Sequence, residues 1–266
     1  DESAGWFNGY YDNDGQRVEG VFPDGARMTL TGQVFTLMCG IASDAQVRQI
    51  ATAADRYLYD PALRGYRLNT PFGGLRLNLG RAFGFAYGHK ENGAMFSHMA
   101  VMYANALYKR GLAAEGWRVL EGIYQQSQDF PVSRMYPGIP EYFSQRGRGM
   151  YPYLTGSASW YLLTLLTEVY GVRGDLGDLV LAPKLLAKQF GAAGQTTVNT
   201  LFAGRKVRVT YQNAQGLEYG QYTIGAVSIN GQAVAVEAIP GGVKIGRAAL
   251  ESLPEQVEIW VALVAG

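Results

Sequence analysis

The two histidines of the chain, His89 and His98, lie in one polar segment. Between them stand Lys90, Glu91 and Asn92, in a loop flanked by glycines. A base, a cation, a carboxylate and an amide in such a loop can surround a polar ligand with hydrogen-bond donors and acceptors. This segment is therefore a candidate ligand site. The alternative, which composition alone favours, is a surface loop with a hydrogen-bonded histidine behind it.

A second segment, residues 151–160, brings Thr155, Gly156 and Ser157 to the expected start of a helix. A helix start is a natural anion site, because its first-turn N–H groups lack partners within the helix and its dipole favours negative charge. The simpler interpretation is that Thr155 or Ser157 only caps a helix. For an isolated segment, composition alone favours the cap.

Two loops rich in glycine, proline and aromatic residues, 72–75 and 137–143, complete the candidates, and the second contains Glu141. Aromatic side chains beside a carboxylate suit carbohydrate, since sugar rings offer C–H faces for stacking and hydroxyls that donate hydrogen bonds to a carboxylate. The simpler interpretation is that the tyrosines, 18 in number, line the inner loops of a large helical domain.

Several classes of protein are excluded. The sequence has no phosphate-binding P-loop, dinucleotide-binding, serine-hydrolase or zinc-protease motif. With no cysteine near His89 and His98, we predict no metal site and no cofactor. A net charge of +1 without a basic run argues against a nucleic-acid partner. No window approaches the roughly 18 to 20 apolar residues of a membrane span, so no membrane partner is expected.

Helical periodicity dominates the first two-thirds of the chain. Ser43-Asp44 should cap a helix that runs to about residue 58. A helix over 94–109 would place Met95, Met99, Met102 and Ala106 on one face and end at Gly111. Further helices are expected over 113–125 and from 155 or 156 to 171.

Alternating apolar and polar residues replace this pattern after about residue 175 and clearly from 207 onward. We predict strands over 207–211, 222–224, 227–229, 234–236, 242–245 and 257–261. Asn230-Gly231 predicts a hairpin turn, because both residues tolerate positive φ. The predicted fold is mainly α and then β: a helical domain over 1–175, followed by a small antiparallel β domain over 176–266, with the boundary near 172–178.

Cys39 is the single cysteine and lies in an apolar stretch, which predicts a small core residue in a reducing, cytoplasmic protein. The chain opens without methionine and runs directly into an aromatic segment, so we expect it to be a fragment of a longer protein.

Two segments together resemble a known family. K-E-N-G-A-M-F-S-H at 90–98 is similar to the K-E-N-G-G-x-F-x-H segment of cellobiose and chitobiose phosphorylases, and L-T-G-S-A-S-W at 154–160 resembles their L-T-G-T-A-S-W. Residues 5–15, 31–35 and 171–183 resemble further segments in the same order. The chain thus resembles the C-terminal part of an inverting glycoside phosphorylase of glycoside hydrolase family 94. His89-Lys90 and the segments 136–143 and 146–151 look most similar to phosphorylases of β-1,2-linked glucose oligomers.

The resemblance implies an (α/α)6 barrel flanked by β domains, and reversible phosphorolysis of a β-glucoside to α-glucose 1-phosphate. Phosphate and an oligosaccharide would be the substrates, with no cofactor. By the same resemblance, one set of residues holds phosphate: His98, Thr155, Gly156 and Ser157. A second set binds sugar: Glu91, Asn92, Lys90 and Glu141.

Departures from the family pattern are few. Ala94 replaces a glycine, and Ser157 replaces a threonine but keeps the hydroxyl. The family's general acid is an aspartate in a D-W-N-D-like motif that precedes the opening segment, and neither Asp12 nor Asp14 matches it. We therefore expect the acid, with the rest of the barrel, upstream or in a second chain, and this piece to be inactive alone; a homodimer is compatible with this. Two alternatives stay open, an inverting hydrolase on the same barrel and a non-catalytic sugar-binding or assembly subunit.

Overall fold

The computed structural model describes residues 4–135, 138–153 and 155–266. Tyr136, Pro137 and Leu154, which belong to segments singled out in the sequence, lie outside the described residues. The chain divides into two compact units, Asp1–Leu162 and Leu163–Gly266, which are described one at a time. The assignment of 1–175 to a barrel and of 176–266 to a β domain stays a prediction.

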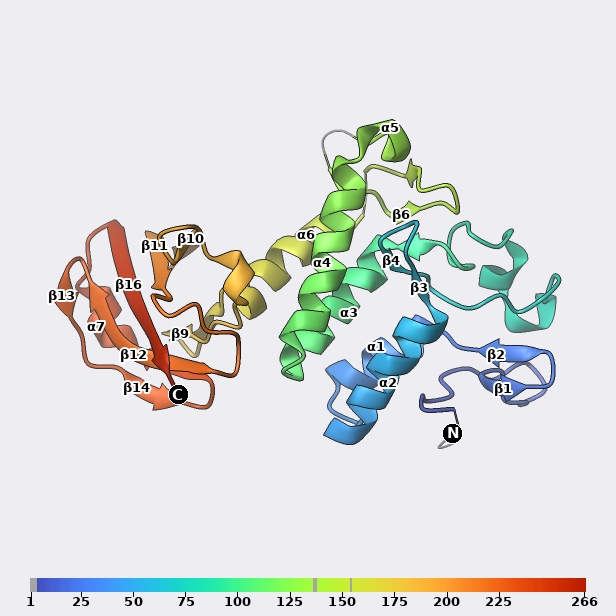
Figure 1. Cartoon of the computed structure of the whole chain (residues 1–266), viewed down its shortest axis with the longest axis horizontal. Coiled ribbons are helices and arrows are strands. Elements are labelled where there is room, and N and C mark those ends of the chain that lie inside the picture. Colours follow the sequence, from blue (N-terminus) through green and yellow to red (C-terminus); the bar gives the residue numbers. More distant parts are fainter. Residues whose placement is uncertain (1–3, 136–137, 154) are drawn as a thin grey trace. The chain divides into compact units, whose positions relative to one another are not determined.

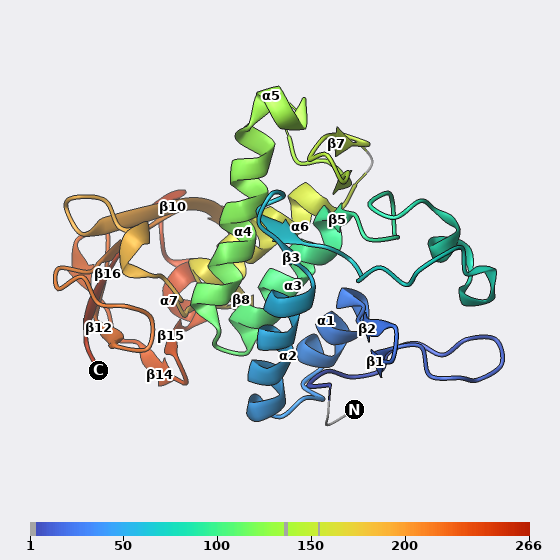
Figure 2. The same cartoon turned by 45° about the vertical axis from the view of Figure 1, so that its right-hand side comes forward.

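The first unit is built on helices, and α3 lies between α1 and α4 (Figures 1 and 2). Nine of the 13 residues of α3 are buried, because both of these helices cover it. The helices are α1 (Leu30–Met38), α2 (Asp44–Tyr57), α3 (Ser97–Lys109), α4 (Ala113–Gln128), α5 (Phe130–Ser133) and α6 (Ser157–Thr164). Two short strands precede the helices, β1 (Gly20–Phe22) and β2 (Gly25–Arg27), and two more follow α2, β3 (Tyr59–Asp60) and β4 (Gly65–Tyr66). These helices do not test membership of an (α/α)6 barrel, which stays a prediction.

The predicted cap of α2 is confirmed. The Ser43 hydroxyl accepts from the N–H of Gln46, and the Gln46 side chain accepts in turn from the N–H of Ser43. This reciprocal pair is a capping box, which satisfies two backbone donors at the helix start.

Helix α3 begins three residues later than predicted. Residues 95–96 instead form strand β5 (Met95–Phe96), which pairs with β6 (Tyr142–Phe143). Within the helix, Met99 and Met102 are only half-buried. Sequence periodicity alone could not show that the first predicted turn of the helix would pair with a strand far along the chain.

Cys39 is exposed, so its predicted place in the core is wrong. Helix α1 buries Leu30, Val34 and Leu37. Cys39 follows Leu37 by two positions, which at about 100° per residue turns it to the opposite side of the helix.

The second unit begins at Leu163 with the last residues of α6, continues through a π-helical stretch η3 (Leu165–Val169) and then becomes β structure. One sheet has the order β14-β15-β9-β8 and the other β10-β11-β16-β12-β13. The strands are β8 (Val172–Asp175), β9 (Asp178–Leu181), β10 (Gln195–Phe202), β11 (Arg205–Gln212), β12 (Tyr222–Ile229), β13 (Gln232–Ala233), β14 (Glu237–Ile239), β15 (Gly242–Ile245) and β16 (Gln256–Ala265), with a short helix α7 (Arg247–Glu251).

The β domain is not wholly antiparallel as predicted, because β11 and β16 pair in parallel. Strand β12 runs antiparallel to β16, and β16 lies between β11 and β12 in the sheet. The last strand thus fills the gap that the chain leaves between two earlier strands. The pairing of β16 with β11 and β12 joins segments that are far apart in the sequence, and a local pattern does not reveal such a pairing.

Most predicted strands are confirmed, and the Asn230-Gly231 turn joins β12 and β13 with both residues at positive φ. Residues 222–224 and 227–229 form one strand with an irregularity between Ile224 and Ala226. Residues 234–236 fall between β13 and β14 and are not a strand. Strands β8, β9 and β10 were not predicted.

Candidate active site

Short strands of the first unit bring distant segments together. Strand β6 pairs with β5 on one side and with β7 (Gly149–Met150) on the other. Just past β5, the N–H of Ser97 donates to the carbonyl of Glu141 at 2.8 Å. The loop before β5, the start of α3 after it and the residues that flank β6 therefore share one framework.

His98 lies in the first turn of α3 and contacts the start of α6. A Cβ placed on Gly156 would lie 2.7 Å from Cε1 of His98 and 3.1 Å from each ring nitrogen. The Trp160 ring, further along α6, has its centroid 5.9 Å from that of the imidazole. The structure thus brings together the two segments that the sequence assigned to phosphate.

The Nε2 atom of His98 is buried and has no hydrogen-bond partner among the described residues. Burial lowers the pKa of His98, which favours the neutral form of the ring. A buried polar atom without a partner is costly unless a ligand or water satisfies it. An anion beside the ring would do so, and would also raise its pKa.

The hydroxyls of Thr155 and Ser157 lie 2.7 Å apart at the start of α6. The N–H of Ser157 also donates to the Thr155 hydroxyl, at 3.2 Å. These contacts lie at and just before the first residue of α6, and the simpler interpretation, that Thr155 or Ser157 only caps the helix, stays a prediction. One hydroxyl hydrogen is used between the two side chains, which leaves the other to donate to a ligand.

Lys90 and Glu141 satisfy each other. The Lys90 Nζ lies 3.1 Å from a Glu141 carboxylate oxygen and 3.4 Å from the centroid of the Tyr151 ring, with Tyr142 also nearby. Desolvation opposes the charge of Lys90, but the hydrogen bond and charge of Glu141 outweigh it and raise the pKa of the lysine. The cation–π contact with Tyr151 adds to this. Both predicted sugar-binding side chains are thus held by protein groups.

Glu91, the next residue, is held far less. Its Oε2 is buried without a hydrogen-bond partner among the described residues. Its Oε1 lies 3.7 Å from a guanidinium nitrogen of Arg81, too far for a hydrogen bond, and the Arg81 side chain is largely exposed. Glu91 therefore keeps acceptor capacity for a ligand.

Asn92 is used within the fold. Its Nδ2 donates to the carbonyl of Phe85 at 2.7 Å, and its Oδ1 accepts from Asn69 at 3.1 Å. It shapes the loop, and its contact with substrate stays a prediction. Asn69 and Arg67, which hold this loop, were missed, because no spacing in residues 65–70 marks them as partners of a loop further along the chain.

A small aromatic hollow of about 220 Å³ adjoins this loop. It joins the predicted loop 72–75 to the segment just before Glu91. Its lining consists of Phe72, Gly73, Gly74, Leu75, Phe83, Gly84, Phe85, Ala86, Tyr87 and Asn92. The stacked rings of Phe72 and Phe83, 4.8 Å apart, belong to its wall.

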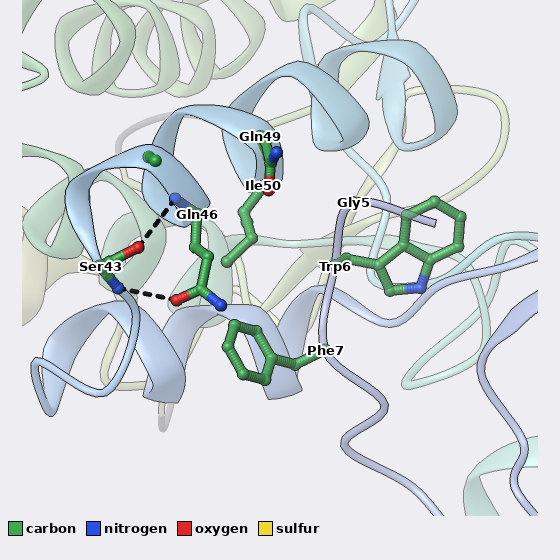
Figure 3. A pocket seen from close by; sticks show the side chains of 8 residues that line it. Gly5, Trp6, Phe7, Ser43, Gln46, Gln49 and Ile50 are labelled. Atoms are coloured by element: carbon green, nitrogen blue, oxygen red, sulfur yellow. Dashed lines mark hydrogen bonds between the residues drawn. The ribbon is translucent and has the colours of Figure 1, made fainter. Parts of the chain in front are cut away.

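A larger hollow of about 430 Å³ lies elsewhere, between the opening segment and α2 (Figure 3). Trp6, Phe7, Gln46 and Gln49 are among its lining residues. The polar groups of Ser43 and Gln46 that bond each other there form the α2 cap. The hollow shares no residue with the predicted site.

Within the described residues, no group of three or more His, Cys, Asp or Glu side chains could hold a metal ion. Over the same part of the chain, every helix is too short or too polar to cross a bilayer.

The catalytic-domain model of the glycosyl hydrolase 94 superfamily matches residues 2–171. A 3-O-beta-D-glucopyranosyl-beta-D-glucuronide phosphorylase of Paenibacillus borealis is 24% identical over 251 residues, 89% of this chain and 31% of the relative. An N,N'-diacetylchitobiose phosphorylase of Vibrio furnissii is 25% identical over 252 residues, 91% of this chain and 30% of the relative. A cyclic beta-(1,2)-glucan synthase of Rhizobium meliloti is 25% identical over 217 residues, 74% of this chain and 8% of the relative. The chain spans about a third of the length of the two phosphorylases, whose covered shares are 31% and 30%.

Proposed function

Because this chain belongs to the glycosyl hydrolase 94 superfamily, we propose that it is part of an inverting phosphorylase, which cleaves β-glucosides reversibly with inorganic phosphate to give α-glucose 1-phosphate. The observation that carries the proposal is the contact between His98 and Gly156 at a helix start, with a buried Nε2 that has no hydrogen-bond partner among the described residues. A helix start and an imidazole together supply donors and positive potential to one anion.

In this proposal phosphate takes the place of the water used by an inverting hydrolase. It attacks the anomeric carbon from the face opposite the leaving group, so that a β-glucoside gives an α-phosphate. His98 donates from Nε2 to one phosphate oxygen, while the hydroxyls of Thr155 and Ser157 and the backbone at Gly156 serve the others. Binding of the anion raises the pKa of His98, and the bound imidazole takes up a proton more readily.

Glu91 is proposed to accept hydrogen bonds from sugar hydroxyls. Its buried Oε2 lacks a protein partner among the described residues. The aromatic hollow beside Asn92 supports a sugar ring nearby, since aromatic faces stack on C–H groups. Lys90 and Glu141 would contribute to the same sugar site as a neutralised pair.

No described residue is assigned as the general acid. Asp12 is the first carboxylate among the described residues, and its Oδ1 accepts from the N–H groups of Asp14 and Gln16 at 3.0 and 2.8 Å. It therefore closes a local turn. We propose that the acid belongs to the remainder of the barrel.

Among β-glucosides, we propose β-1,2-linked gluco-oligosaccharides as the substrates. The proposal rests on His89-Lys90 and the segments 136–143 and 146–151. A related protein named for the synthesis of a cyclic β-(1,2)-glucan is consistent with it. Comparison of initial rates on β-1,2-linked, β-1,3-linked and β-1,4-linked disaccharides tests it, and equal or lower rates on the β-1,2 compound would refute it.

The activity is tested with the complete protein and a β-glucoside, with and without inorganic phosphate. We expect α-glucose 1-phosphate in proportion to phosphate, and the reverse reaction from that product. Glucose released at the same rate without phosphate would favour the inverting hydrolase. Saccharide binding without any turnover would favour the non-catalytic subunit.

A further inference from the structure

The loop that presents Glu91 is a tight turn whose tip and base are fixed separately. The N–H of Gly88 donates to the carbonyl of Asn92 at 2.7 Å, which closes the turn. Lys90, at its tip, has a positive φ of 50°. The side chain of Lys90 is held by Glu141, whereas among the described residues Glu91 has only the long ion pair with the largely exposed Arg81, at 3.7 Å. The direction of Glu91 therefore depends on the base of the turn.

The base is held by the carboxamide of Asn69, which is 1% exposed. Its Oδ1 accepts from the N–H of Gly93 at 2.7 Å, while its Nδ2 donates to Oδ1 of Asn92 at 3.1 Å. One side chain thus grips both residues that follow Glu91. The hydroxyl of Tyr87 donates to the carbonyl of Asn69 at 3.1 Å and ties the other arm of the turn to the same point.

Arg67 completes this grip. Its Nη1 donates to the carbonyl of Gly93 at 2.7 Å, and its Nε and Nη2 bind one carboxylate oxygen of Asp60 at 3.0 and 2.6 Å. Gly93 is at a φ of 72°, and a Cβ there would lie 2.1 Å from the Tyr87 ring. The backbone at Gly93 is therefore fixed by Asn69 at its N–H, by Arg67 at its carbonyl and by the Tyr87 ring beside its Cα.

We infer that Asn69, assisted by Arg67, is a positioning residue that aims the Glu91 carboxylate at the sugar. The inference rests on the proposed function, because it gives Glu91 the role of sugar acceptor. Asn69 has no spare polar atom for substrate, since its Oδ1 and Nδ2 are both engaged with protein groups. It acts through Glu91.

The test uses Asn69→Ala in the complete enzyme, with kinetics measured separately for saccharide and for phosphate. We expect kcat/KM for the saccharide to fall by about tenfold to a hundredfold, because a catalytic-site group misplaced by about 1 Å costs on this scale. The KM for phosphate should stay within about twofold, because the contact between His98 and Gly156 is not part of the grip. Arg67→Lys, which keeps the charge but loses the forked geometry, should show the same pattern with a smaller loss.

Gln33→Ala is the matched control. Gln33 is also a fully buried amide that grips a backbone, accepting from the N–H of Phe7 at 3.0 Å and donating to its carbonyl at 2.8 Å. We expect it to lower the melting temperature without changing the saccharide-to-phosphate ratio of kinetic effects. Unchanged saccharide kinetics in Asn69→Ala, or an equal shift of both substrates, would overturn the inference. Absence of phosphate-dependent cleavage in the unmodified enzyme would instead refute the proposed function.

Discussion

Two groups of polar residues are attached to the same short sheet, and they differ in how the fold treats them. Around Lys90 the charges are matched, since its ammonium meets Glu141 and an aromatic face. Around His98 a buried nitrogen beside a glycine has no hydrogen-bond partner in the part of the chain that the structure describes. Buried polar groups are almost always hydrogen-bonded in proteins. The unmatched group therefore indicates where a ligand belongs, whereas the matched pair indicates how the site is held in shape.

The same contrast separates neighbouring carboxylates. Glu141 is engaged by Lys90, whereas Glu91 has a buried oxygen without a partner in the described part of the chain. The resemblance assigned all of these residues to the sugar. Their differing environments predict that substitutions will have effects of different size and kind.

The largest effect is expected from Gly156→Ala. The backbone of Gly156 is not at positive φ, so alanine is tolerated conformationally, but its Cβ would lie 2.7 Å from the His98 ring. Displacement of the ring should lower kcat/KM for phosphate by about a hundredfold. Gly246→Ala is the matched control, because Gly246 also precedes a helix and a Cβ there meets nothing within 4 Å. Equal phosphate kinetics in the two variants would contradict the assignment of the His98 group to phosphate.

Glu91→Gln should have the next largest effect. The amide keeps the shape but loses the charge that strengthens hydrogen bonds from sugar hydroxyls. A charge-assisted hydrogen bond contributes about 1.5 to 3 kcal/mol, so kcat/KM for the saccharide should fall by roughly tenfold or more. Phosphate KM should change little. A fall in kcat/KM for phosphate alone would show that Glu91 binds phosphate and not the sugar.

Lys90→Met should act mainly on stability. It leaves the Glu141 carboxylate without its cation, and both side chains of the pair are about a quarter exposed, 21% and 26%. We expect a loss of about 1 kcal/mol in the free energy of unfolding, measured by denaturant titration. Part of it should return in the double variant Lys90→Met/Glu141→Gln. A loss of activity larger than that of Glu91→Gln would show that the lysine contacts substrate directly.

The smallest effect on activity is expected from Glu19→Gln, far from both groups in sequence. Glu19 is buried, is hydrogen-bonded by Thr29 and Gln33, and burial raises its pKa to about 7 from an ordinary 4.5. A carboxyl whose pKa is raised on folding binds its proton more tightly in the folded state, so stability falls as pH rises from 4.5 through 7. Thermal unfolding across this window should be less pH-dependent in the variant. An unchanged slope would contradict this.

Local patterns predicted the parts of the fold that depend on nearby residues. The Ser43 cap and the Asn230-Gly231 turn are set within a few positions, and both are confirmed. The start of α3 and the parallel pairing of β16 depend on distant strands, so periodicity could not give them. The exposure of Cys39 depends on which side of α1 faces the core, which an uninterrupted apolar stretch does not mark.

In the candidate site too, the sequence predicted some residues, whereas others depend on contacts between distant segments. The family segments named His98, Gly156 and Glu91, because residue types at fixed spacing carry that information. These segments do not indicate that Asn92 would bond the Phe85 carbonyl and the side chain of Asn69. Those roles depend on a contact between segments 23 residues apart.

The most direct test of the account is calorimetric titration of the complete enzyme with inorganic phosphate, in the unmodified protein, His98→Ala and His89→Ala. His89 is the other histidine of the chain, exposed and in the adjoining loop. We predict that His98→Ala weakens phosphate binding by at least about tenfold, the size of one charge-assisted hydrogen bond. His89→Ala should bind as the unmodified enzyme does. Equal phosphate affinity in all of these proteins would contradict the central claim that the imidazole of His98, in α3 and beside the start of α6, holds the anion.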